Sequence, residues 1–384
     1  MGLKYLYVPS GVKAGTAYGV MPNSADADFD DFTRGSAGSR IDKNGFIESV
    51  GSNVPRLDYS DGGCPSLLLE PSRTNYITQS NDFSGWNSGN LYVTSNYAIS
   101  PDGTQNASRL LFTSFSQNIY TNTTSTGDIV GSLYVKGVSG ETIQLFVGGG
   151  ETLFTLNGSW QRIVVEKTSS TNGFFNINTN GGATARDLLI YGSQLEQGSY
   201  PTSYIPTSGS TVTRAAETAN GSGNSEVFND SEGVLMVETS NLISGGSTRV
   251  ISLSSGSQSV NNIYFNFNAS GTLSCQVLTS GGSNSLSTSS ISQENNNKIL
   301  LKYKANDFAL WVNGFKSDID TSLSSTPIGL DRLNFDFGSG SLDFYGKTKE
   351  IGYYDTALTD EELEYMTSYR SLSKLVTELN LNTL

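Results

Sequence analysis

The stretch Ile263-Tyr264-Phe265-Asn266-Phe267-Asn268 alternates between apolar and polar side chains without a break. Alternation with a period of two residues is typical of a β-strand that buries one face and exposes the other. The isoleucine and the two phenylalanines are therefore predicted to face a core, and the tyrosine and the two asparagines to face outward. This segment predicts a sheet that is covered on one side, as in a β-sandwich.

Other segments repeat this pattern and are separated by turn residues. Residues 299–303 alternate in the same way, and the apolar run 308–312 leads into Asn313-Gly314. A second pair, Asn157-Gly158, follows the run 152–156 and precedes another apolar run. Because Asn-Gly between two strand-like runs is the strongest local signal for a tight hairpin, we predict one hairpin at each pair.

The composition extends this prediction to the whole chain. The 384 residues include 42 Gly, and only 15% of them are charged. Such a composition favours short strands joined by many turns, and the length exceeds that of one ordinary β-sandwich. The chain is predicted to be all-β, with two or three domains.

Charge and histidine content exclude several classes of function. The formal net charge is -13, and histidine is absent. Nucleic-acid binders need clustered Lys and Arg to displace counterions, so we predict no nucleic-acid partner. Without histidine the chain lacks the usual general base and zinc ligand. No run approaches the roughly 20 apolar residues of a membrane span, so no membrane insertion is expected and synthesis is expected in the cytoplasm.

Neutral polyhydroxylated ligands fit the composition better than anions do. Such ligands need amide and hydroxyl groups together with aromatic faces, and the chain has 19 Tyr and 18 Phe. The outward face of the opening stretch combines these groups. The candidate carbohydrate-binding residues are Tyr264, Asn266 and Asn268, although the outward face of an ordinary sheet would look the same. No catalytic residue, metal ligand or cofactor site is assigned.

One helix is predicted near the C-terminus. Thr359 can cap it, Glu362 completes a capping box, and Leu358 can pack against Leu363 one turn later. Regularly spaced leucines follow at Leu372, Leu375, Leu379 and Leu384. They could extend the helix, meet equivalent tails of other subunits, or pack back onto their own sandwich.

Three sets of segments resemble parts of bacteriophage virion proteins. The first is similar to the lead-in segment of tail-fibre and head-spike proteins, and it consists of Phe32-Thr33-Arg34 and residues 44–48, 53–59 and 65–75. The second is similar to jelly-roll carbohydrate-binding modules, and it consists of Asp82-Phe83-Ser84-Gly85-Trp86 and residues 100–104, 194–196 and 200–207. The third resembles concanavalin-like, laminin-G-type lectin sandwiches, and it consists of Glu232-Gly233 and residues 308–314 and 353–363.

The resemblance implies two β-sandwich domains, jelly-roll and concanavalin-like, after an irregular N-terminal anchor segment. The expected boundaries are a lead-in and virion-attachment segment at 1–75, a jelly roll at 76–207, a linker at 208–225 and a lectin domain with helix and tail at 226–384.

The resemblance also implies a function. It indicates a structural protein of the virion, assembled in the host cytoplasm as a homotrimeric fibre, spike or capsid-decoration subunit. Its partners would be other virion proteins and host-surface glycans. Head and tail attachment both stay open, because a shared fold does not specify a shared function.

The alternative is a polysaccharide depolymerase, since concanavalin-like sandwiches include glycoside hydrolases. These enzymes need two carboxylates across the scissile bond, and the usual strand of alternating acids is missing here. Asp318 and Asp320 are interpreted as part of a solvated loop, so we expect no enzyme activity.

Jelly-roll modules often hold a structural calcium ion, and Asp187 stands in a strand that would suit one. Trp86, Trp160 and Trp311 match family positions in the core or over a sheet, which favours structural roles.

Overall fold

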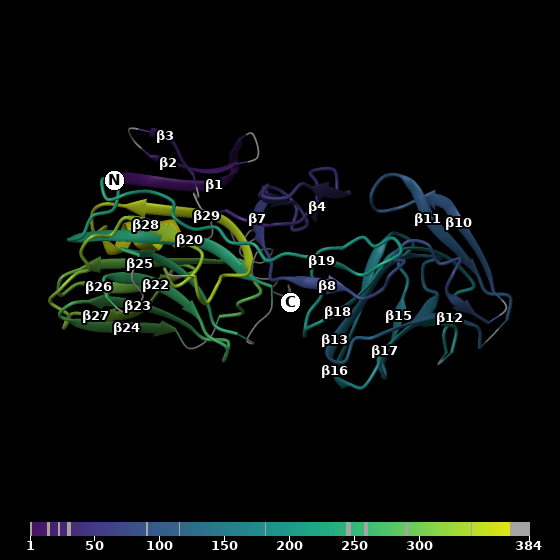
Figure 1. Ribbon diagram of the computed structural model, residues 1–384. Helices are drawn as coiled ribbons and strands as arrows, with labels where there is room; N and C mark the ends of the chain where they lie inside the picture. The colour runs from purple at the N-terminus through teal and green to yellow at the C-terminus, as the bar shows by residue number, and fades with distance from the viewer. Residues whose placement is uncertain are drawn as a thin grey trace. The chain divides into compact units, whose positions relative to one another are not determined.

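The chain divides into two compact units that are each built from β-sheets (Figure 1). Unit 1 comprises Met1–Arg34, Asn53–Pro71 and Glu217–Leu384, and unit 2 comprises Gly35–Ser52 and Ser72–Ala216. This computed structural model describes residues 2–13, 16–21, 24–28, 32–89, 91–114, 116–180, 182–242, 247–256, 260–288, 291–338 and 340–368. The all-β prediction is confirmed. None of the described helical segments has the length and apolarity that crossing a bilayer requires.

Unit 1 is a sandwich of a ten-stranded and a five-stranded sheet. The large sheet has the order β27-β26-β25-β20-β29-β1-β2-β3, and β7 and then β6 extend it from β29. Its strands are β1 (Leu3–Lys13), β2 (Thr16–Met21), β3 (Ser24–Asp28), β6 (Arg56–Asp58), β7 (Ser66–Leu69), β20 (Glu232–Asn241), β25 (Asn297–Lys304), β26 (Phe308–Val312), β27 (Phe315–Asp320) and β29 (Gly346–Tyr354). The small sheet, in the order β24-β23-β22-β21-β28, contains β21 (Arg249–Ser254), β22 (Asn262–Phe267), β23 (Leu273–Thr279), β24 (Gly282–Thr288) and β28 (Arg332–Asn334).

The core of unit 1 lies between these two sheets. Ile263, Phe265 and Phe267 of β22 face it, as their alternation predicts, and all three are buried. Leu235 and Val237 of β20 contribute from the large sheet. Each such side chain contributes roughly 1.5–3 kcal/mol when it is fully buried, so this face holds the register of β22.

Unit 2 contains two five-stranded sheets and two short two-stranded ones. The first sheet, in the order β10-β11-β18-β13-β16, contains β10 (Tyr92–Ile99), β11 (Gln105–Leu111), β13 (Gly127–Lys136), β16 (Gln161–Ser170) and β18 (Asp187–Gln197). The second, in the order β15-β14-β17-β12-β9, contains β9 (Asn87–Ser88), β12 (Asn118–Thr123), β14 (Thr142–Val147), β15 (Gly150–Thr155) and β17 (Gly173–Asn178). The short pairs are β4 (Gly38–Ile41) with β5 (Ile47–Val50), and β8 (Arg73–Asn75) with β19 (Val212–Arg214).

The N-terminal segment differs from the irregular anchor that we expected at residues 1–75. β1 pairs antiparallel with β29 inside the large sheet. Tyr5 and Tyr7 of β1 are fully buried in the core of unit 1, and the Tyr5 hydroxyl lies 2.8 Å from Ser222 Oγ. Residues 35–52 belong to unit 2 instead. The expected boundary at residue 75 therefore does not follow the compact units, because core-forming tyrosines precede it.

Residues 208–225 also differ from the linker that we expected. Val212, Thr213 and Arg214 form β19, which pairs with β8. Further on, Ser222 forms a β-bridge to Leu333, with backbone hydrogen bonds of 3.1 and 2.8 Å. Paired backbone of this kind is ordered structure rather than a flexible connection.

The two predicted hairpins have different outcomes. Asn313 and Gly314 have φ of 51° and 87° and join β26 to β27, so that hairpin is confirmed. Asn157-Gly158 does not join paired strands, because β15 pairs with β14 whereas β16 pairs with β13 in the other sheet. The prediction there was wrong, since both flanking runs have partners elsewhere.

The loop expected at Asp318 and Asp320 is also wrong, because both residues belong to β27.

The predicted helix is confirmed as α1 (Asp360–Thr367). Thr359 is its N-cap, and Glu362 completes the capping box. Leu358 and Leu363 both join a second apolar cluster on the outer side of the large sheet, where Trp311 is also buried. The leucine-rich tail at Leu372, Leu375, Leu379 and Leu384 lies outside the described residues.

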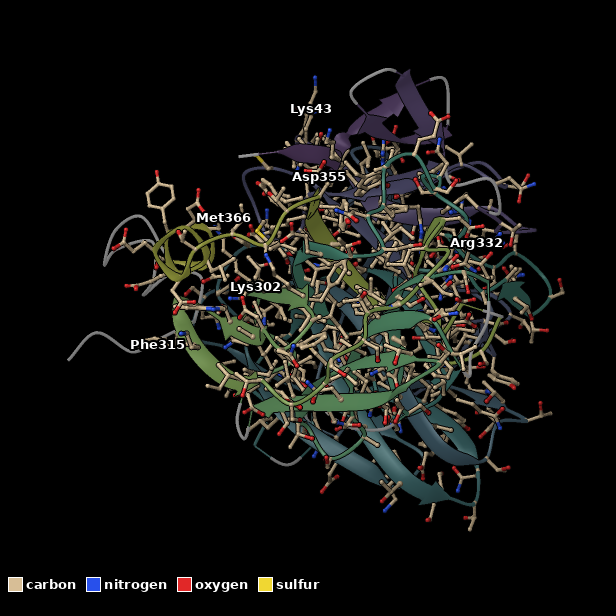
Figure 2. The ribbon with its side chains drawn as sticks, turned by 90° about the vertical axis from the view of Figure 1, so that its left-hand side faces the viewer. Lys43, Lys302, Phe315, Arg332, Asp355 and Met366 are labelled. Atoms are coloured by element: carbon tan, nitrogen blue, oxygen red, sulfur yellow. The ribbon has the colours of Figure 1, made fainter. Side chains whose placement is uncertain are left out.

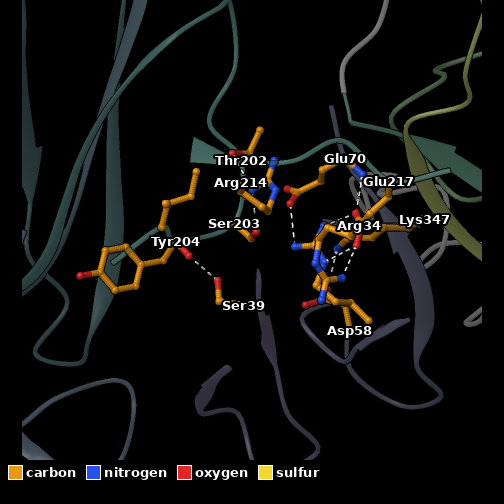
Figure 3. Close-up of polar contacts among 12 residues, drawn as sticks. Arg34, Ser39, Asp58, Glu70, Thr202, Ser203, Tyr204, Arg214, Glu217 and Lys347 are labelled. Atoms are coloured by element: carbon orange, nitrogen blue, oxygen red, sulfur yellow. Dashed lines mark hydrogen bonds and ion pairs between the residues drawn. The ribbon is translucent and has the colours of Figure 1, made fainter. Parts of the chain in front are cut away.

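A buried ionic cluster joins four distant positions within unit 1 (Figure 3). Arg34 Nη1 lies 2.7 Å from Glu217 Oε1, and Arg56 Nη1 lies 2.8 Å from Glu70 Oε2. Arg56 Nε also donates to Glu217 Oε1 at 2.8 Å. The side chains of the two arginines and of Glu217 are fully buried. Two cations and two anions at these distances leave no net charge in the cluster, although removing one member would leave a buried charge without its partner.

Candidate functional site

Unit 2 contains a cavity of about 470 Å³, within the range of small-molecule sites. Its walls come from the hairpin β4–β5, from the turn between β10 and β11, from β18 and from residues 204–214. Ile47, Pro206 and Val212 supply apolar surface, and Asn81 and Asp102 supply polar groups. A cavity with apolar walls and a few convergent polar groups can hold a compact ligand and fix its orientation.

Asp102 is the centre of the polar wall. Its Oδ1 accepts hydrogen bonds from Ser100 Oγ at 2.8 Å and from Thr104 N and Oγ1 at 2.8 and 2.7 Å. Its Oδ2 accepts from Asn106 Nδ2 at 2.7 Å and from the Tyr191 hydroxyl at 2.9 Å. Partial burial raises the pKa of Asp102, but these hydrogen bonds outweigh it and hold the pKa below the ordinary value. The carboxylate is therefore ionised and fully occupied, and it positions Asn106 and Tyr191.

Asn81 fixes the two tyrosines of the site. Its Oδ1 accepts hydrogen bonds from Gly192 N and from the Tyr204 hydroxyl, both at 2.9 Å. The Tyr204 hydroxyl also lies 2.6 Å from Ser80 Oγ. The Asn81 side chain also hydrogen-bonds the Tyr191 side chain, so Asn81 ties both tyrosines together. Among the described residues that line the cavity, the buried Asn106 Oδ1 has no hydrogen-bond partner and is available to a ligand donor.

A row of aromatic rings lies beside the polar wall. Tyr134 alternates with core residues of β13 and so points to the outer face of its sheet. Ring centroids are 6.3 Å apart for Tyr134 and Tyr191, and 5.4 Å apart for Tyr191 and Tyr204. The Arg162 guanidinium lies 5.5 Å from the Tyr134 ring. Both ring pairs are tilted, at 57° and 59°. Rings of this kind offer apolar surface next to hydroxyl groups, which is how proteins contact sugar rings.

Gly192 makes this close ring packing feasible. It has a φ of +64°, which other residues rarely adopt. A Cβ atom there would lie 3.2 Å from Tyr134 Cδ2 and 3.4 Å from Tyr204 Cε2. The position between the rings therefore requires the absence of a side chain.

The hairpin β4–β5 closes one side of the cavity and is fixed by hydrogen bonds within unit 2. Ile47 N donates to Pro101 O at 2.9 Å, and Ser39 Oγ donates to Tyr204 O at 2.5 Å (Figure 3). Ala215 N donates to Ser36 Oγ at 2.9 Å. Residues 35–52, expected as part of a lead-in segment, thus build a wall of the candidate site.

The cavity offers no free charge to a ligand. Among the described residues that line it, Asp102 is the only carboxylate and Arg214 the only cation. The Arg214 side chain is buried, and its Nη1 donates to Thr202 Oγ1 at 3.1 Å and to Ser203 Oγ at 3.0 Å (Figure 3). A neutral ligand with hydroxyl or amide groups matches these walls better than a charged one.

The three residues predicted from sequence lie elsewhere, in unit 1. Tyr264 is only 6% exposed, because its ring packs edge-on against Phe337 with centroids 4.6 Å apart. Its hydroxyl donates to Gln276 Oε1, and burial raises the pKa of Tyr264 to about 12. Asn266 is partly exposed on β22, whereas Asn268 lies beyond that strand and donates to Thr272 Oγ1 at 3.1 Å. The structure thus places one of the three candidates under its own chain.

The segment around Phe337 covers this face of the small sheet. Asn262 Nδ2 donates to Phe337 O at 3.2 Å, and Val250 N donates to Leu342 O at 3.0 Å. Both donors come from strands of that sheet. Alternation along β22 places Tyr264 on the outer face but carries no information about a segment that folds over it.

The residue suggested for calcium is already paired. Both carboxylate oxygens of Asp187 accept hydrogen bonds from Arg109, at 2.7 and 2.6 Å. These bonds outweigh partial burial and lower the pKa of Asp187. The described residues contain no group of three or more His, Cys, Asp or Glu side chains that could hold a metal ion.

The tryptophans divide into two groups. Trp86 packs in the core of unit 2, with its centroid 4.9 Å from that of Phe83, and Trp311 is buried near α1, so both are structural as expected. Trp160 is only partly buried, and its Nε1 donates to Ile99 O at 3.2 Å. Trp160 is therefore outside the core, and the predicted position over a sheet stays a prediction.

No protein-family model and no curated protein matches this chain. Solved structures of β-sandwich domains do. The carbohydrate-binding module CBM40 of the Ruminococcus gnavus IT-sialidase, bound to α2,3-sialyllactose, is 16% identical, covers 39% of this chain and 94% of its own, and has a TM-score of 0.34. Domain 4 of AbnA, an extracellular arabinanase from Geobacillus stearothermophilus in complex with arabinotriose, is 12% identical, with coverages of 44% and 82% and a TM-score of 0.31.

Domains LG4-5 of the mouse laminin α1 chain are 10% identical, cover 76% of this chain and 92% of their own, and have a TM-score of 0.27. At these identities and TM-scores the likenesses concern the fold alone, and no residue role is taken from them.

Proposed function

We propose that this chain is a non-enzymatic glycan-binding protein of a bacteriophage virion. It serves as a fibre, spike or capsid-decoration subunit and assembles as a homotrimer. Its ligand site is the cavity of unit 2, and its partners are host-surface glycans and other virion proteins.

The single observation that carries glycan binding is the make-up of the cavity. Asp102 holds the Asn106 amide, whose Oδ1 has no hydrogen-bond partner among the described residues, and Tyr191 and Tyr204 line the same cavity. An amide acceptor beside aromatic side chains suits neutral hydroxylated ligands. The charge of -13 disfavours phosphate-rich partners and leaves neutral glycans unaffected.

The proposal that the protein lacks catalytic activity rests on the same site. Glycoside hydrolysis uses two carboxyl groups, held roughly 5 to 9.5 Å apart across the bond that breaks. The described lining of the cavity contains one carboxylate, Asp102, and its oxygens already accept five hydrogen bonds. A saturated and ionised carboxylate is a poor general acid.

The virion part of the proposal rests on the sequence resemblance of residues 32–34, 44–48, 53–59 and 65–75 to the lead-in of fibre and spike proteins. Imaging of the assembled particle with an antibody against unit 2 tests it. Label on the head or the tail supports the proposal and decides between them, and particles without label contradict it.

Glycan binding is tested by blocking the cavity. Ser49 is exposed on β5 and lines the cavity, so Ser49→Trp fills the space without touching the Asp102 and Asn81 hydrogen bonds. Thr155→Trp, at an exposed position of β15 away from the lining, is the matched control. We expect glycan-array binding by the wild-type chain and the control, and at least about tenfold weaker binding by Ser49→Trp.

Three outcomes count against the proposal. Equal binding by both variants would place the ligand elsewhere, and an empty array would leave a structural protein without a ligand. Release of reducing ends from host polysaccharide by the purified wild-type chain would establish the depolymerase instead.

A further inference from the structure

The open acceptor in the cavity of unit 2 has a fixed orientation. Asn106 Nδ2 donates to Asp102 Oδ2 at 2.7 Å. Because an ionised carboxylate accepts hydrogen bonds and donates none, the Asn106 amide can face Asp102 only with its nitrogen. The amide oxygen, Oδ1, has no hydrogen-bond partner among the described residues. A ligand in this cavity therefore meets a hydrogen-bond acceptor that needs a donor.

Apolar side chains make up much of the remaining lining. Ile47 of β5 and Val212 of β19 line the cavity, together with Ala37, Ile205 and Pro206. Val212 is 37% exposed, so part of its side chain is free to contact a ligand. A ligand hydroxyl against such side chains loses its hydrogen bonds to water without replacement, whereas a methyl group gains from the contact.

The cavity has no carboxylate available for an amine. Asp102 is the only carboxylate among the described residues that line it, and its two oxygens accept five hydrogen bonds. An ammonium group buried here would lack a charged partner, which disfavours its binding. A sugar with a free amine is therefore a poor ligand for this cavity.

We propose that this cavity binds the acetamido group of an N-acetylated sugar. The N–H of that group donates to Asn106 Oδ1, and its methyl group contacts Val212 and Ile47. An amide N–H only donates, so a single acceptor satisfies it, whereas a hydroxyl bound at the same atom still has acceptor lone pairs to satisfy. The acetamido group thus combines a donor with an apolar end, which matches the open acceptor and the apolar walls.

This inference rests on the proposed function, because it names the class of sugar that the same cavity takes. The proposed function holds for any neutral glycan, whereas this inference requires an acetamido group.

Titration calorimetry of the full chain with free sugars tests the inference. The probes are N-acetylglucosamine and N-acetylgalactosamine, and the counterparts without the acetyl group are glucose, galactose and glucosamine. We expect both acetylated sugars to bind at least about tenfold more tightly, because the counterparts lack the apolar contact. Saturation-transfer NMR should give its strongest signal at the acetyl methyl protons, which contact the protein.

Two variants test the two contacts separately. Asn106→Leu removes the acceptor and should weaken binding of the acetylated sugars at least about tenfold. Val212→Ser removes two methyl groups from the wall and should lower the preference for acetylated sugars by about tenfold, with glucose binding unchanged. Val138→Ser, at a 60% exposed position of unit 2 outside the lining, is the matched control and should bind as the wild-type chain does. Circular dichroism checks the fold of each variant, and Val212→Ser decides if Asn106→Leu does not fold.

Three outcomes overturn the inference. Glucose or glucosamine that binds as tightly as N-acetylglucosamine does so and leaves glycan binding by the cavity in place. A folded Val212→Ser variant with an unchanged sugar preference excludes the methyl contact. Failure of both acetylated sugars to bind is the third, and the glycan array then separates the two levels: binding of other glycans retains the proposed function, and an empty array contradicts it as well.

Discussion

The outer faces of the two sandwiches differ in what covers their tyrosines. In unit 1, Tyr264 lies under Phe337, and the segment that carries Phe337 closes the face. In unit 2, Tyr191 and Tyr204 line a cavity of about 470 Å³. All three tyrosines are nearly buried, at 6%, 4% and 3% exposure, and Tyr204 lies in the segment after β18 rather than on a strand. The difference is that a cavity lies beside the tyrosines of unit 2, and the connecting segments decide where such a cavity forms.

The largest expected effect is a loss of stability in unit 1 that unit 2 does not share. Glu217→Ala leaves the buried Arg34 and Arg56 without one anion, which costs about 3–5 kcal/mol. Unit 1 should lose stability and unit 2 should keep it, as measured by hydrogen exchange with mass spectrometry under increasing urea. Glu364→Ala, at an exposed position on α1, is the control and should change little. An equal loss in both units would show that they unfold together.

The second effect concerns the tyrosines of unit 2 around Gly192. Gly192→Ala adds a methyl group between Tyr134 and Tyr204 and forces a non-glycine residue into a positive φ. We expect a loss of about 1–3 kcal/mol in thermal unfolding and weaker glycan binding. Gly182→Ala has a similar φ of +89° but open space around it, so it controls for backbone strain. Unchanged binding by Gly192→Ala would mean that the tyrosine row does not contact the ligand.

The third effect concerns Tyr264 of unit 1, which Phe337 covers. Phe337→Ala removes the ring that covers Tyr264, at a cost of about 1 kcal/mol for the aromatic pair. The pKa of Tyr264 should fall from about 12 toward its ordinary value of 10, as followed by ultraviolet absorbance titration. Phe315→Ala, at a position 75% exposed, should leave this titration unchanged. A Tyr264 pKa that stays near 12 would show that Phe337 is not the cover.

The smallest effect is a pH dependence of the open face. The pKa of Asp102 is lower in the folded chain than the ordinary value of 3.8. Its hydrogen bonds therefore contribute stability above pH 3.8 that is lost as the pH falls through the folded value. Asp102→Asn should flatten the decrease of unfolding free energy in this acid range, as measured by urea unfolding at several pH values. An unchanged acid slope would mean that Asp102 is not a source of it.

Local patterns predicted local structure well. The capping box of Thr359 and Glu362 was confirmed because the cap and its partner lie within four residues of the chain. The hairpin at Asn157-Gly158 was wrong because the choice of partner strand depends on distant residues. The fold class could be predicted because it depends on local alternation. The expected boundaries differ from the compact units because membership of a unit depends on contacts between distant residues.

The candidate site could not be found from sequence for a related reason. Asp102 stands in a segment that we matched to jelly-roll modules, but nothing local marks it as part of a cavity. The walls come from Ile47, Asn81, Tyr191 and Val212, which are far apart along the chain. The turn Pro101-Asp102-Gly103-Thr104, with its side chains that bond to their own backbone, was the one available signal.

The interleaving of the two units constrains how such a protein can evolve. The chain passes from one unit to the other four times, after Arg34, Ser52, Pro71 and Ala216. A recombination event at any single point therefore separates strands from the core that they complete, as β1 with Tyr5 and Tyr7 illustrates. Exchange of unit 2 between relatives requires residues 35–52 and 72–216 to be inherited together with the short segment between them. We expect natural mosaics of this protein to have their breakpoints outside residues 35–216.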